Sequence, residues 1–499
     1  MTTNNNEPKV REIVIIGGGL IGVSTAYYLS KQVGLHPESK ITLIEEENVG
    51  TGSSGYSSGL LKQLSTKYQD DNENQELTKK GFELHQKLAK NHKGELKWGY
   101  KSIDLYEADI ASTVNSTTHS QLNGNSDQPS CSYSSSSSTA SACIPSFLPP
   151  STITSVKSSN NDDNKEASTA TAICQPSDLT RHLCGLFLTY PGASLLIAKA
   201  TSLTFDENDD ENFDDTDLQN IDDTDLNQEE CLENNDNDDD DNNNNNILSS
   251  ITNAITSTFT STTTSQKDVD VKHKRKRKVK GINVIQIING IEEIVHLNCD
   301  TIILSPGIKF NLLLKELQLF NNNPQIPIPK QLEIENKQWE TIILKPKEKL
   351  KPCAVHLSSI SSDTNNEKKK KKNGKIEIIV RDDGKVLISR LSPNQPTPDT
   401  NPNSKLSVIV DGKSPSSSSS DNDDLLSYIS KIIPKFNSSN GTLTLSKIKW
   451  LSPSLERPFF GNLSEHLDVD ISGIWFGIGG NTTQGPAIGL QLASEVLKN

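Results

Sequence analysis

The sequence predicts an α/β fold assembled from separate stretches of a 499-residue chain. An apolar run, a glycine-rich turn and a helical pattern follow one another between Arg11 and Ser30, which is the order of a parallel strand–helix unit. A second strand, KITLIE, ends at Glu45. Long polar stretches elsewhere are too poor in apolar residues to join a core. We therefore expect a parallel sheet with covering helices, interrupted by inserts.

The turn after the first strand has the spacing of a phosphate-binding loop. Gly17, Gly19 and Gly22 match G-x-G-x-x-G, and apolar positions recur at helical spacing from Leu20 onward. The first glycine permits the tight turn, the second lets a pyrophosphate approach the backbone, and the third lets helix and strand pack closely. The motif predicts a dinucleotide at the helix N-terminus, where unpaired N–H groups favour negative charge. A glycine-rich bend without a ligand is the alternative.

The acid at the end of the second strand makes the nucleotide interpretation more specific. Glu45 lies 23 positions after Gly22. A carboxylate at this place can accept hydrogen bonds from both hydroxyls of a ribose. Strand, glycines, helix, second strand and acid in this order favour nucleotide binding over a plain turn.

The chain has a low hydrophobic content, 32%, because a few segments contain hardly any apolar residues. Residues 112–142 are rich in Ser, Asn and Thr, and residues 206–246 are acidic and rich in Asn. The second segment holds 19 acidic residues up to Asp241, so without them the formal charge of −14 would become +5. We interpret both segments as disordered insertions, and the acidity as a property of the insert.

Other features bound the class of protein. Two basic runs, Lys272–Lys280 and Lys368–Lys372, fit solvated charge beside insertions, with nuclear-localisation or anionic-membrane patches as alternatives. The seven cysteines show neither C-x-x-C nor metal-ligand spacing, which predicts reduced thiols, no metal, and no dithiol reductase. No leader, membrane-spanning stretch or nucleic-acid motif is expected. The cytoplasm is the expected location.

The remaining structured segments give further elements in chain order. Helices are expected at residues 74–90, 177–188 and 425–433, and from about Pro486 to the end. The segment LKWGYKSIDLYEA alternates like a strand. Asn289-Gly290 predicts a type I′ hairpin turn. Strands are also expected at residues 301–304, in KIEIIV and KVLIS, and in DISGIWFGIGG before the last helix.

Several segments together resemble the FAD-dependent oxidoreductases of the D-amino-acid-oxidase-like (DAO) superfamily. They are IVIIGGGLIGVSTAYYLS, ITLIE, GSSGYSSGLL, QPSDL, CDTIILSPG, ERPFFG and GGNTTQGPAIGLQLASEVL. The third is similar to the fungal and plant DAO-like branch. The resemblance implies a Rossmann-like, three-layer FAD-binding domain with discontinuous segments, an antiparallel-sheet substrate domain, and FAD as cofactor. Without Cys or His in the Ser/Gly loop, we expect the FAD to be non-covalent.

The resemblance also implies which residues contact the cofactor. The glycine turn and the first residues of its helix would hold the pyrophosphate, and Glu45 the adenosine ribose. The Ser/Gly loop and the terminal loop would lie along the flavin, a strand backbone would contact adenine, and one glycine would pass close to the dinucleotide. The full set is Gly17, Gly18, Gly19, Leu20, Ile21, Gly22, Glu45, Ser53, Ser54, Gly59, Leu60, Leu203, Gly307, Gly479, Gly480, Asn481, Thr482 and Gln484.

For the substrate, the resemblance points to Arg457 in ERPFFG. Family members commonly use such an Arg-Pro arginine to clamp a carboxylate through two hydrogen bonds. A surface arginine beside a proline is the alternative. The terminal loop, GIGGNTTQG, lacks the Gly-His and Trp-Gly pairs that many family members carry.

The expected domain organisation follows from these motifs and inserts. FAD-binding segments are expected at residues 8–62, 170–205, 279–310 and 451–499, and substrate-domain segments at 63–106 and 311–450. A low-complexity insert is expected at 107–169 and an acidic, Asn-rich insert with a basic end at 206–278. Disordered inserts are also expected near 358–374 and 392–423, within the second substrate-domain segment.

Three functions remain open at this point. The leading hypothesis is a flavoprotein that oxidises a C–N bond of a small amine or amino-acid-like substrate by hydride transfer to flavin N5. The first alternative is a flavin-fold protein that acts through protein partners at its charged inserts in endosome-to-Golgi retrograde transport, with peripheral endosomal association. The second alternative, an NAD(P)-dependent dehydrogenase, explains the first motif but not the terminal glycine turn.

Overall fold

The computed structural model describes all of the expected α/β segments, which fall within one compact unit formed by Met1–Asp206 and Lys276–Asn499. The acidic stretch and most of the other expected inserts lie outside the described residues. The described ranges are 9–32, 35–63, 71–110, 145–149, 153–158, 170–206, 277–317, 319, 334–359, 375–392, 408–409, 425–455, 457–466 and 471–498.

A six-stranded sheet with the order β19-β21-β12-β1-β2-β8 forms the centre of the first domain. Neighbouring strands from β21 to β8 run parallel, and β19 is an antiparallel edge strand. Consecutive residues of β1 point to opposite faces, and all of Ile13–Ile16 are buried, as expected for a strand covered on both sides. The bounds are β1 Glu12–Ile16, β2 Lys40–Glu45, β8 Ala193–Ile197, β12 Thr301–Leu304, β19 Phe459–Asn462 and β21 Ile474–Ile478.

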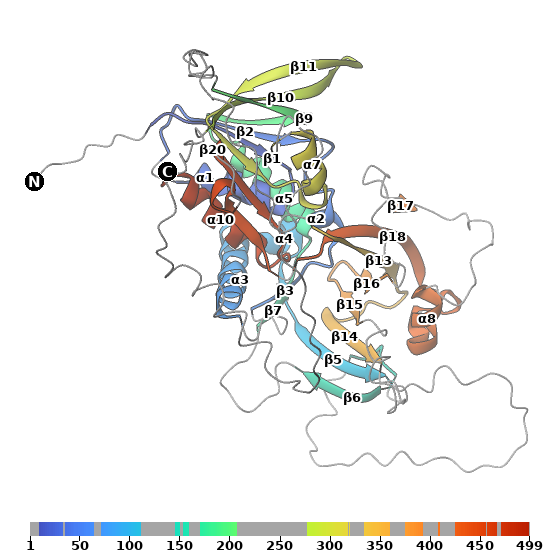
Figure 1. The fold of residues 1–499 in the computed structure, drawn as a ribbon. Coiled ribbons are helices and arrows are strands. Elements are labelled where there is room, and N and C mark those ends of the chain that lie inside the picture. The colour runs from blue at the N-terminus through green and yellow to red at the C-terminus, as the bar shows by residue number, and fades with distance from the viewer. Residues whose placement is uncertain are drawn as a thin grey trace, which may run out of the picture. The chain divides into compact units, whose positions relative to one another are not determined.

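Three helices cover one face of this sheet. Ile13 and Ile15 of β1 pack with apolar residues of α1 (Leu20–Leu29), α5 (Pro176–Phe187) and α10 (Gly485–Val496). The longer helix α3 (Asn72–His92) joins the same core through Phe82 and Leu88. Figure 1 shows the red α10 beside the blue α1, so the two ends of the described chain lie together.

A second sheet and a short helix cover the other face. Val14 and Ile16 of β1 pack with buried residues of β10 (Arg277–Ile288) and α7 (Phe310–Glu316). In this layer β10 pairs with β9 (Lys199–Phe205), β11 (Ile291–Asn298) and β20 (Ile471–Ser472). The arrangement of helices, parallel sheet and antiparallel layer confirms the predicted three-layer domain.

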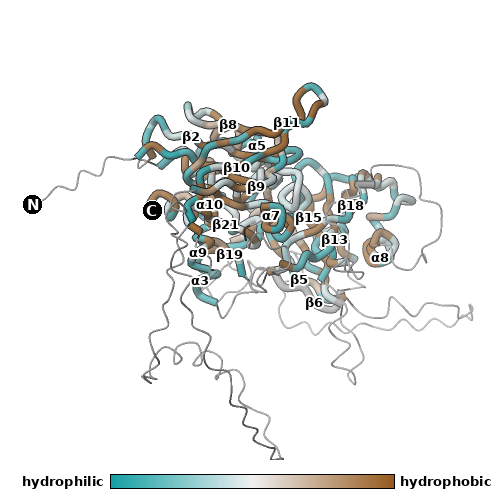
Figure 2. Tube along the Cα trace, turned by 45° about the horizontal axis from the view of Figure 1, so that its top comes forward, coloured by the Kyte–Doolittle hydropathy of each residue, from teal (hydrophilic) through white to brown (hydrophobic). Residues whose placement is uncertain are grey.

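The hairpin formed by β10 and β11 has the predicted Asn-Gly turn. Asn289 and Gly290 both have positive φ, 54° and 82°, as a type I′ turn requires. Around the tip, Ile287 and Ile291 are 68% and 64% exposed, and Figure 2 shows apolar colour at this end of β11. The hairpin therefore carries an apolar surface away from the central sheet.

The second domain is built on an eight-stranded sheet with the order β17-β18-β13-β16-β15-β14-β5-β6. All neighbouring pairs are antiparallel except β14 with β5, so the expected antiparallel-sheet domain is confirmed. One face packs against α8 (Leu425–Ile432), whose Ile429 and Ile432 are buried. The strands are β5 Asp104–Ile110, β6 Ile153–Ser158, β13 Asn336–Lys345, β14 Cys353–Ser359, β15 Ile376–Val380, β16 Val386–Leu391, β17 Val408–Ile409 and β18 Leu443–Pro453.

A small three-stranded sheet connects the Ser/Gly loop with the second domain. Its order is β3-β7-β4, with β3 at Leu60–Lys62, β7 at Thr171–Ile173 and β4 at Lys101–Ser102. Leu60 and Ile173 pack against the second face of the eight-stranded sheet. The remaining short helices are α2 (Ser53–Tyr56), α4 (Gly94–Trp98) and α9 (Leu463–His466).

Two local expectations need correction. The start of LKWGYKSIDLYEA is helical, because Lys93 and Gly99 take left-handed conformations that bracket the single turn α4, and the strands begin only at Lys101. The range 107–169, expected to be an insert, contains the end of β5 and all of β6, and Phe147 and Leu148 within it are buried. A two-residue apolar step in a Ser-rich context carries too little periodicity to be recognised from sequence. The shorter β17 likewise falls inside the range 392–423.

Candidate cofactor site

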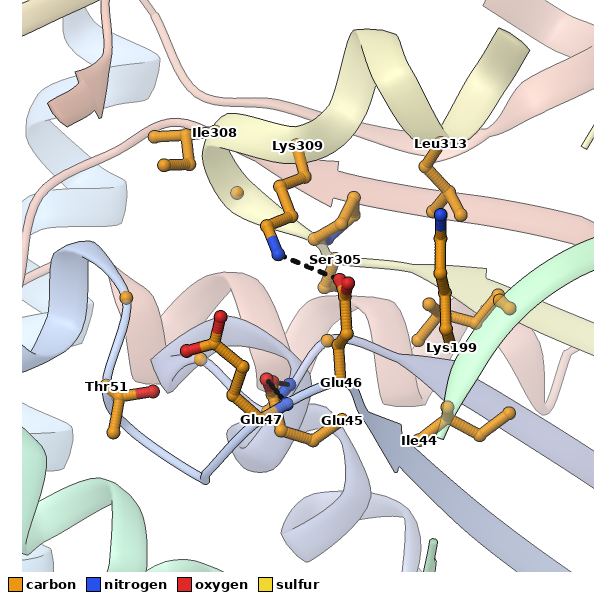
Figure 3. A pocket seen from close by; sticks show the side chains of 18 of the residues that line it. Ile44, Glu45, Glu46, Glu47, Thr51, Lys199, Ser305, Ile308, Lys309 and Leu313 are labelled. Atoms are coloured by element: carbon orange, nitrogen blue, oxygen red, sulfur yellow. Dashed lines mark hydrogen bonds and ion pairs between the residues drawn. The ribbon is translucent and has the colours of Figure 1, made fainter. Parts of the chain in front are cut away.

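A cavity of about 190 Å³ opens at the carboxyl ends of β1, β2 and β12. In an open α/β sheet this is the edge at which ligands bind. Figure 3 shows Glu45, Glu46 and Glu47 on one side of the cavity and Lys309 on the other. Of the residues expected at the cofactor, those that line this cavity are Gly17, Gly18, Gly19, Glu45, Ser53, Ser54 and Gly307.

The three glycines of the turn have different neighbours. A Cβ at Gly17 would strike the carbonyl oxygen of Ser305, and one at Gly22 would strike that of Gly17. These two glycines are therefore required by the close approach of backbone. At Gly19 the only atom near a built Cβ is Ser54 Oγ at 3.6 Å, so this position faces open space. The pattern matches the roles that the motif assigns to its glycines.

The N-terminus of α1 points its first amide groups toward this space. Gly19 is the N-cap residue and has no side chain with which to cap the helix, and the first turn contains no acidic residue. Leu20 N donates to Ser54 Oγ over 3.0 Å. A helix end with a glycine at the N-cap and no acidic residue in its first turn is suited to an anionic group such as a pyrophosphate. These residues therefore fit the diphosphate of a dinucleotide.

Glu45 is held at the floor of the cavity by two backbone amides. Its Oε2 accepts from Gly18 N over 2.6 Å, and its Oε1 accepts from Glu47 N over 3.0 Å. Both bonds fix the carboxylate beside the glycine turn. The structure thus brings the predicted ribose ligand and the predicted phosphate loop together.

The far end of the cavity was not predicted from the sequence. It is lined by Ala198–Ala200 before and within β9, and by Ile308 and Leu313 around α7. Leu203, the expected adenine contact on β9, lies outside this lining because the chain leaves the cavity after Ala200. Two alanines directly after the edge strand β8, Ala198 and Ala200, are the signal that could have marked this end of the cavity.

Ion pairs close this end of the cavity. Lys309 Nζ lies 2.8 Å from Glu46 Oε2, and Lys199 Nζ lies 2.7 Å from Glu316 Oε1. The apolar residues between these pairs form a surface suited to a flat ring such as adenine.

Most of the other expected cofactor residues lie on two loops that meet outside the lining of this cavity. The Ser/Gly loop (residues 50–59) meets the terminal loop (residues 479–485), since Ser57 Oγ and Thr482 Oγ1 lie 3.0 Å apart. Lys62 N, just after the Ser/Gly loop, donates to Thr483 Oγ1 over 3.2 Å. The members of this group are Gly59, Leu60, Gly479, Gly480, Asn481, Thr482 and Gln484. Leu20, Ile21 and Gly22 form the start of α1.

Helix α1 connects the two groups. A Cβ at Gly485 would lie 2.7 Å from Leu20 Cδ2, and one at Gly489 would lie 2.5 Å from Ser24 Cβ. The first turn of α10 therefore packs directly against the first turns of α1. The glycine turn and the terminal loop therefore precede two helices that pack directly against each other.

The terminal loop is supported by α3, which the sequence did not link to the site. Buried His85 Nε2 donates to Thr482 O over 2.9 Å, and Gln484 Nε2 donates to Thr78 Oγ1 over 3.0 Å. Gly81 touches the loop so closely that a Cβ there would strike Thr483 O. No local pattern marks these contacts, because α3 and the loop are about 400 residues apart.

Burial of His85 has a consequence for the pH dependence of folding. Burial lowers its pKa from 6.5 to about 4, so it stays neutral in the folded protein while the unfolded chain takes up a proton below pH 6.5. Stability from this residue is complete above that pH and is lost as the pH falls through about 4, a change of about 3 kcal/mol.

We expect His85→Gln, which keeps an N–H donor toward Thr482, to unfold with a weaker pH dependence than the wild type. The measurement is the free energy of unfolding in urea at pH 7 and pH 4.5. The wild type should lose more stability across this range than the variant. Equal losses would show that His85 already binds a proton in the folded state.

Arg457 lies apart from the cavity. Its Nε is 2.7 Å from Asp71 Oδ2, and its side chain is 67% exposed. Asp71 is also the N-cap of α3, where it accepts from Asn74 N over 3.1 Å. A carboxylate clamp at Arg457 would have to compete with this ion pair. The substrate role of Arg457 therefore stays a prediction.

Among the described residues, no group of three or more His, Cys, Asp or Glu side chains could hold a metal ion. No helix in the same part of the chain is long and apolar enough to cross a membrane. The four cysteines that the structure describes, Cys174, Cys184, Cys299 and Cys353, are free and buried.

Fold and site together define a class of two-domain α/β proteins: a three-layer domain with a dinucleotide-type glycine turn, discontinuous in sequence, beside an antiparallel-sheet domain. Residues 12–111 match the family model "FAD dependent oxidoreductase" (DAO). The match covers 100 of the 499 residues and agrees with the resemblance seen in the sequence.

Two curated relatives are yeast proteins. The chain is 36% identical over 115 residues to "Putative oxidoreductase TDA3" of Saccharomyces cerevisiae, covering 22% of this chain and 20% of the relative. It is 33% identical over 97 residues to "Putative oxidoreductase C1F5.03c" of Schizosaccharomyces pombe, covering 19% of this chain and 24% of the relative. The matches thus span about a quarter or less of these relatives' own lengths.

Solved structures share the fold over nearly the whole chain. Glycine oxidase from Bacillus cereus matches with a TM-score of 0.51 at 12% identity, covering 97% of this chain and 94% of that chain. L-Proline dehydrogenase from P. horikoshii matches with a TM-score of 0.53 at 13% identity, covering 98% and 93%. At this identity the likeness concerns the fold.

Proposed function

We propose that this protein binds FAD non-covalently and oxidises a C–N bond of an amine or amino-acid-like substrate. The observation that carries the proposal is the cavity in which the glycine turn, Glu45 and Gly307 meet at the N-terminus of α1. The family match of residues 12–111 supports the same cofactor.

In this proposal each part of the site holds one part of the cofactor. Gly17–Gly19 and the first amides of α1 bind the diphosphate, Glu45 binds the ribose, and Ala198–Ala200 with Leu313 enclose the adenine. The Ser/Gly loop and the terminal loop line the isoalloxazine ring. The bound flavin would supply the acceptor for hydride, and the N-terminus of α10 would stabilise negative charge on the reduced ring.

The substrate class is proposed from the names of the fold relatives and from what hydride transfer requires of a protein. Glycine oxidase and L-proline dehydrogenase, by their names, act on amino acids. For hydride transfer from a C–N carbon, the protein has chiefly to orient the substrate and to exclude water from the site. Arg457 is the proposed carboxylate ligand, provided that the substrate displaces Asp71 from it.

A spectrum of the purified protein tests the proposal. We expect a yellow protein with a flavin absorption band that is released by denaturation, and bleaching of the band without oxygen by at least one member of a panel of amines and amino acids. A colourless protein that binds NAD(P)H would instead support the dehydrogenase alternative. A yellow protein that no amine bleaches would favour the alternative that acts through protein partners.

That alternative and the proposed cytoplasmic location share one further test. Peripheral endosomal association through the charged inserts would place part of the protein with membranes and release it at high salt, because exposed charges are screened there. Fractionation of cells at low and high salt measures this directly.

A further inference from the structure

A row of polar side chains crosses the eight-stranded sheet on the face that meets the small sheet β3-β7-β4. Directly paired positions carry them on adjacent strands: Glu107 on β5, His356 on β14, Glu377 on β15, Ser389 on β16 and Thr341 on β13. Directly paired residues share one face of a sheet. The row therefore lies on one side, opposite the apolar face covered by α8.

Lys62 joins this row from the Ser/Gly loop side. Its Nζ is 3.5 Å from His356 Nδ1, while its backbone N–H is bonded to Thr483 of the terminal loop. His356 Nε2 lies 3.3 Å from Glu377 Oε2, and Ser58 also bonds Glu377. Lys62 thus reaches from the loops proposed to line the flavin into a charged cluster of the second domain.

The chemistry of these groups fixes the direction of the hydrogen bonds. A lysine ammonium can only donate and a carboxylate can only accept. His356 therefore accepts at Nδ1 and donates at Nε2. If a proton moves from Lys62 to Nδ1 while another moves from Nε2 to Glu377, the charged pair becomes neutral without displacement of any heavy atom.

The surroundings of Lys62 favour its neutral form more than water does. Burial lowers the pKa of Lys62 and Lys375 lowers it further, whereas Glu377 and Glu107 raise it. Burial alone would raise the pKa of Glu377, but its hydrogen bonds from His356 and Ser58 and the charge of Lys62 lower it overall. At the outer end of the row, the Glu107 side chain is 52% exposed and lies 3.9 Å from His356 Nδ1.

Resting on the proposed function, we propose that Lys62 accepts the proton that an ammonium substrate must lose before its C–N bond is oxidised. The N–H bond of the substrate breaks, its electron pair remains as the amine lone pair, and the proton forms the Lys62 ammonium. Bound FAD would supply the acceptor for the hydride of the neighbouring carbon. The Lys62 ammonium then passes this proton to His356 Nδ1, from which it moves to Glu107, which is half exposed and returns it to solvent, so Lys62 is neutral again.

Acetylation of the protein as purified tests the charge and the accessibility of Lys62. Acetic anhydride acylates neutral amines, and peptide mass spectrometry follows each lysine against pH. We expect Lys62 to reach half-maximal labelling at lower pH than Lys80, which is exposed on α3. In Glu377→Gln, Lys62 should label about tenfold faster at fixed pH, because a charge that stabilised the ammonium is gone, while Lys80 is unchanged. Labelling of Lys62 like Lys80, or at no pH, would overturn the proposal, since a group that meets the substrate must be reachable.

Two variants separate proton transfer from a role in holding the domains together. Lys62→Arg keeps a cation that can tie the loop to His356 but cannot accept a proton, whereas Lys62→Met removes both. We expect both to retain FAD and to slow amine-dependent bleaching at least tenfold at neutral pH, with recovery as the pH rises and the free amine becomes more abundant. Rescue by Lys62→Arg would show that the residue acts only as a tie.

The two hypotheses fail in different ways. Absence of flavin, or a flavin that no amine bleaches, would refute the proposed function, while the labelling result would still decide whether Lys62 is a reachable amine coupled to Glu377. Normal bleaching in Lys62→Met would refute the proton acceptor and leave the oxidoreductase in place.

Discussion

Gly19→Val is expected to weaken FAD binding by about 100-fold or more, close to 3 kcal/mol, while the protein still folds. Gly19 has φ −76° and ψ 178°, an extended conformation that any residue adopts. A Cβ there meets only Ser54 Oγ at 3.6 Å. The added side chain would therefore fill the open space before α1, where the diphosphate is expected, without disturbing the protein around it.

Flavin content per protein and the midpoint of thermal unfolding measure the two effects separately. Gly185→Val is the control, because Gly185 is an exposed helix position of α5 with no atom within 4 Å of a built Cβ. It should keep its flavin. Full flavin occupancy in Gly19→Val would refute the placement of the diphosphate at this turn.

Gly489→Leu is expected to destabilise the protein by about 3 kcal/mol and to release the flavin. A Cβ at Gly489 would lie 2.5 Å from Ser24 Cβ and 2.8 Å from Thr25 N, so α10 could not keep its distance from α1. Because the terminal loop leads directly into α10, its displacement would move the proposed ring-lining segment as well.

Gly185→Leu is the matched comparison for this packing contact. Leucine is a better helix former than glycine, so at this exposed position the change should stabilise α5 by somewhat under 1 kcal/mol. Free energies of unfolding in urea give both values. If the two substitutions changed stability in the same direction and by similar amounts, close packing of the chain ends would not be what holds the site together.

Local sequence patterns were sufficient to predict most of the helices and strands. The β-branched run at Ile13–Ile16, the Asn289-Gly290 turn and Pro486 near the start of α10 each act through the conformation of a few neighbouring residues. Such signals are written into consecutive residues, so they can be read without knowing the fold. They failed at α4, where a single helical turn is bracketed by left-handed Lys93 and Gly99 and strand-like alternation was misleading.

The sequence by itself determined most of the strands and helices, the spacing of Gly17, Gly19 and Gly22, and the acid at the end of β2. Only the tertiary structure decided that His85 supports Thr482, that Ala198 lines the far end of the cavity, and that Lys62 meets His356 beside Glu377. The physical reason is that these contacts join residues far apart in the chain. Their distances are set by how α3 and the two large sheets pack, and no run of neighbouring residues carries that information.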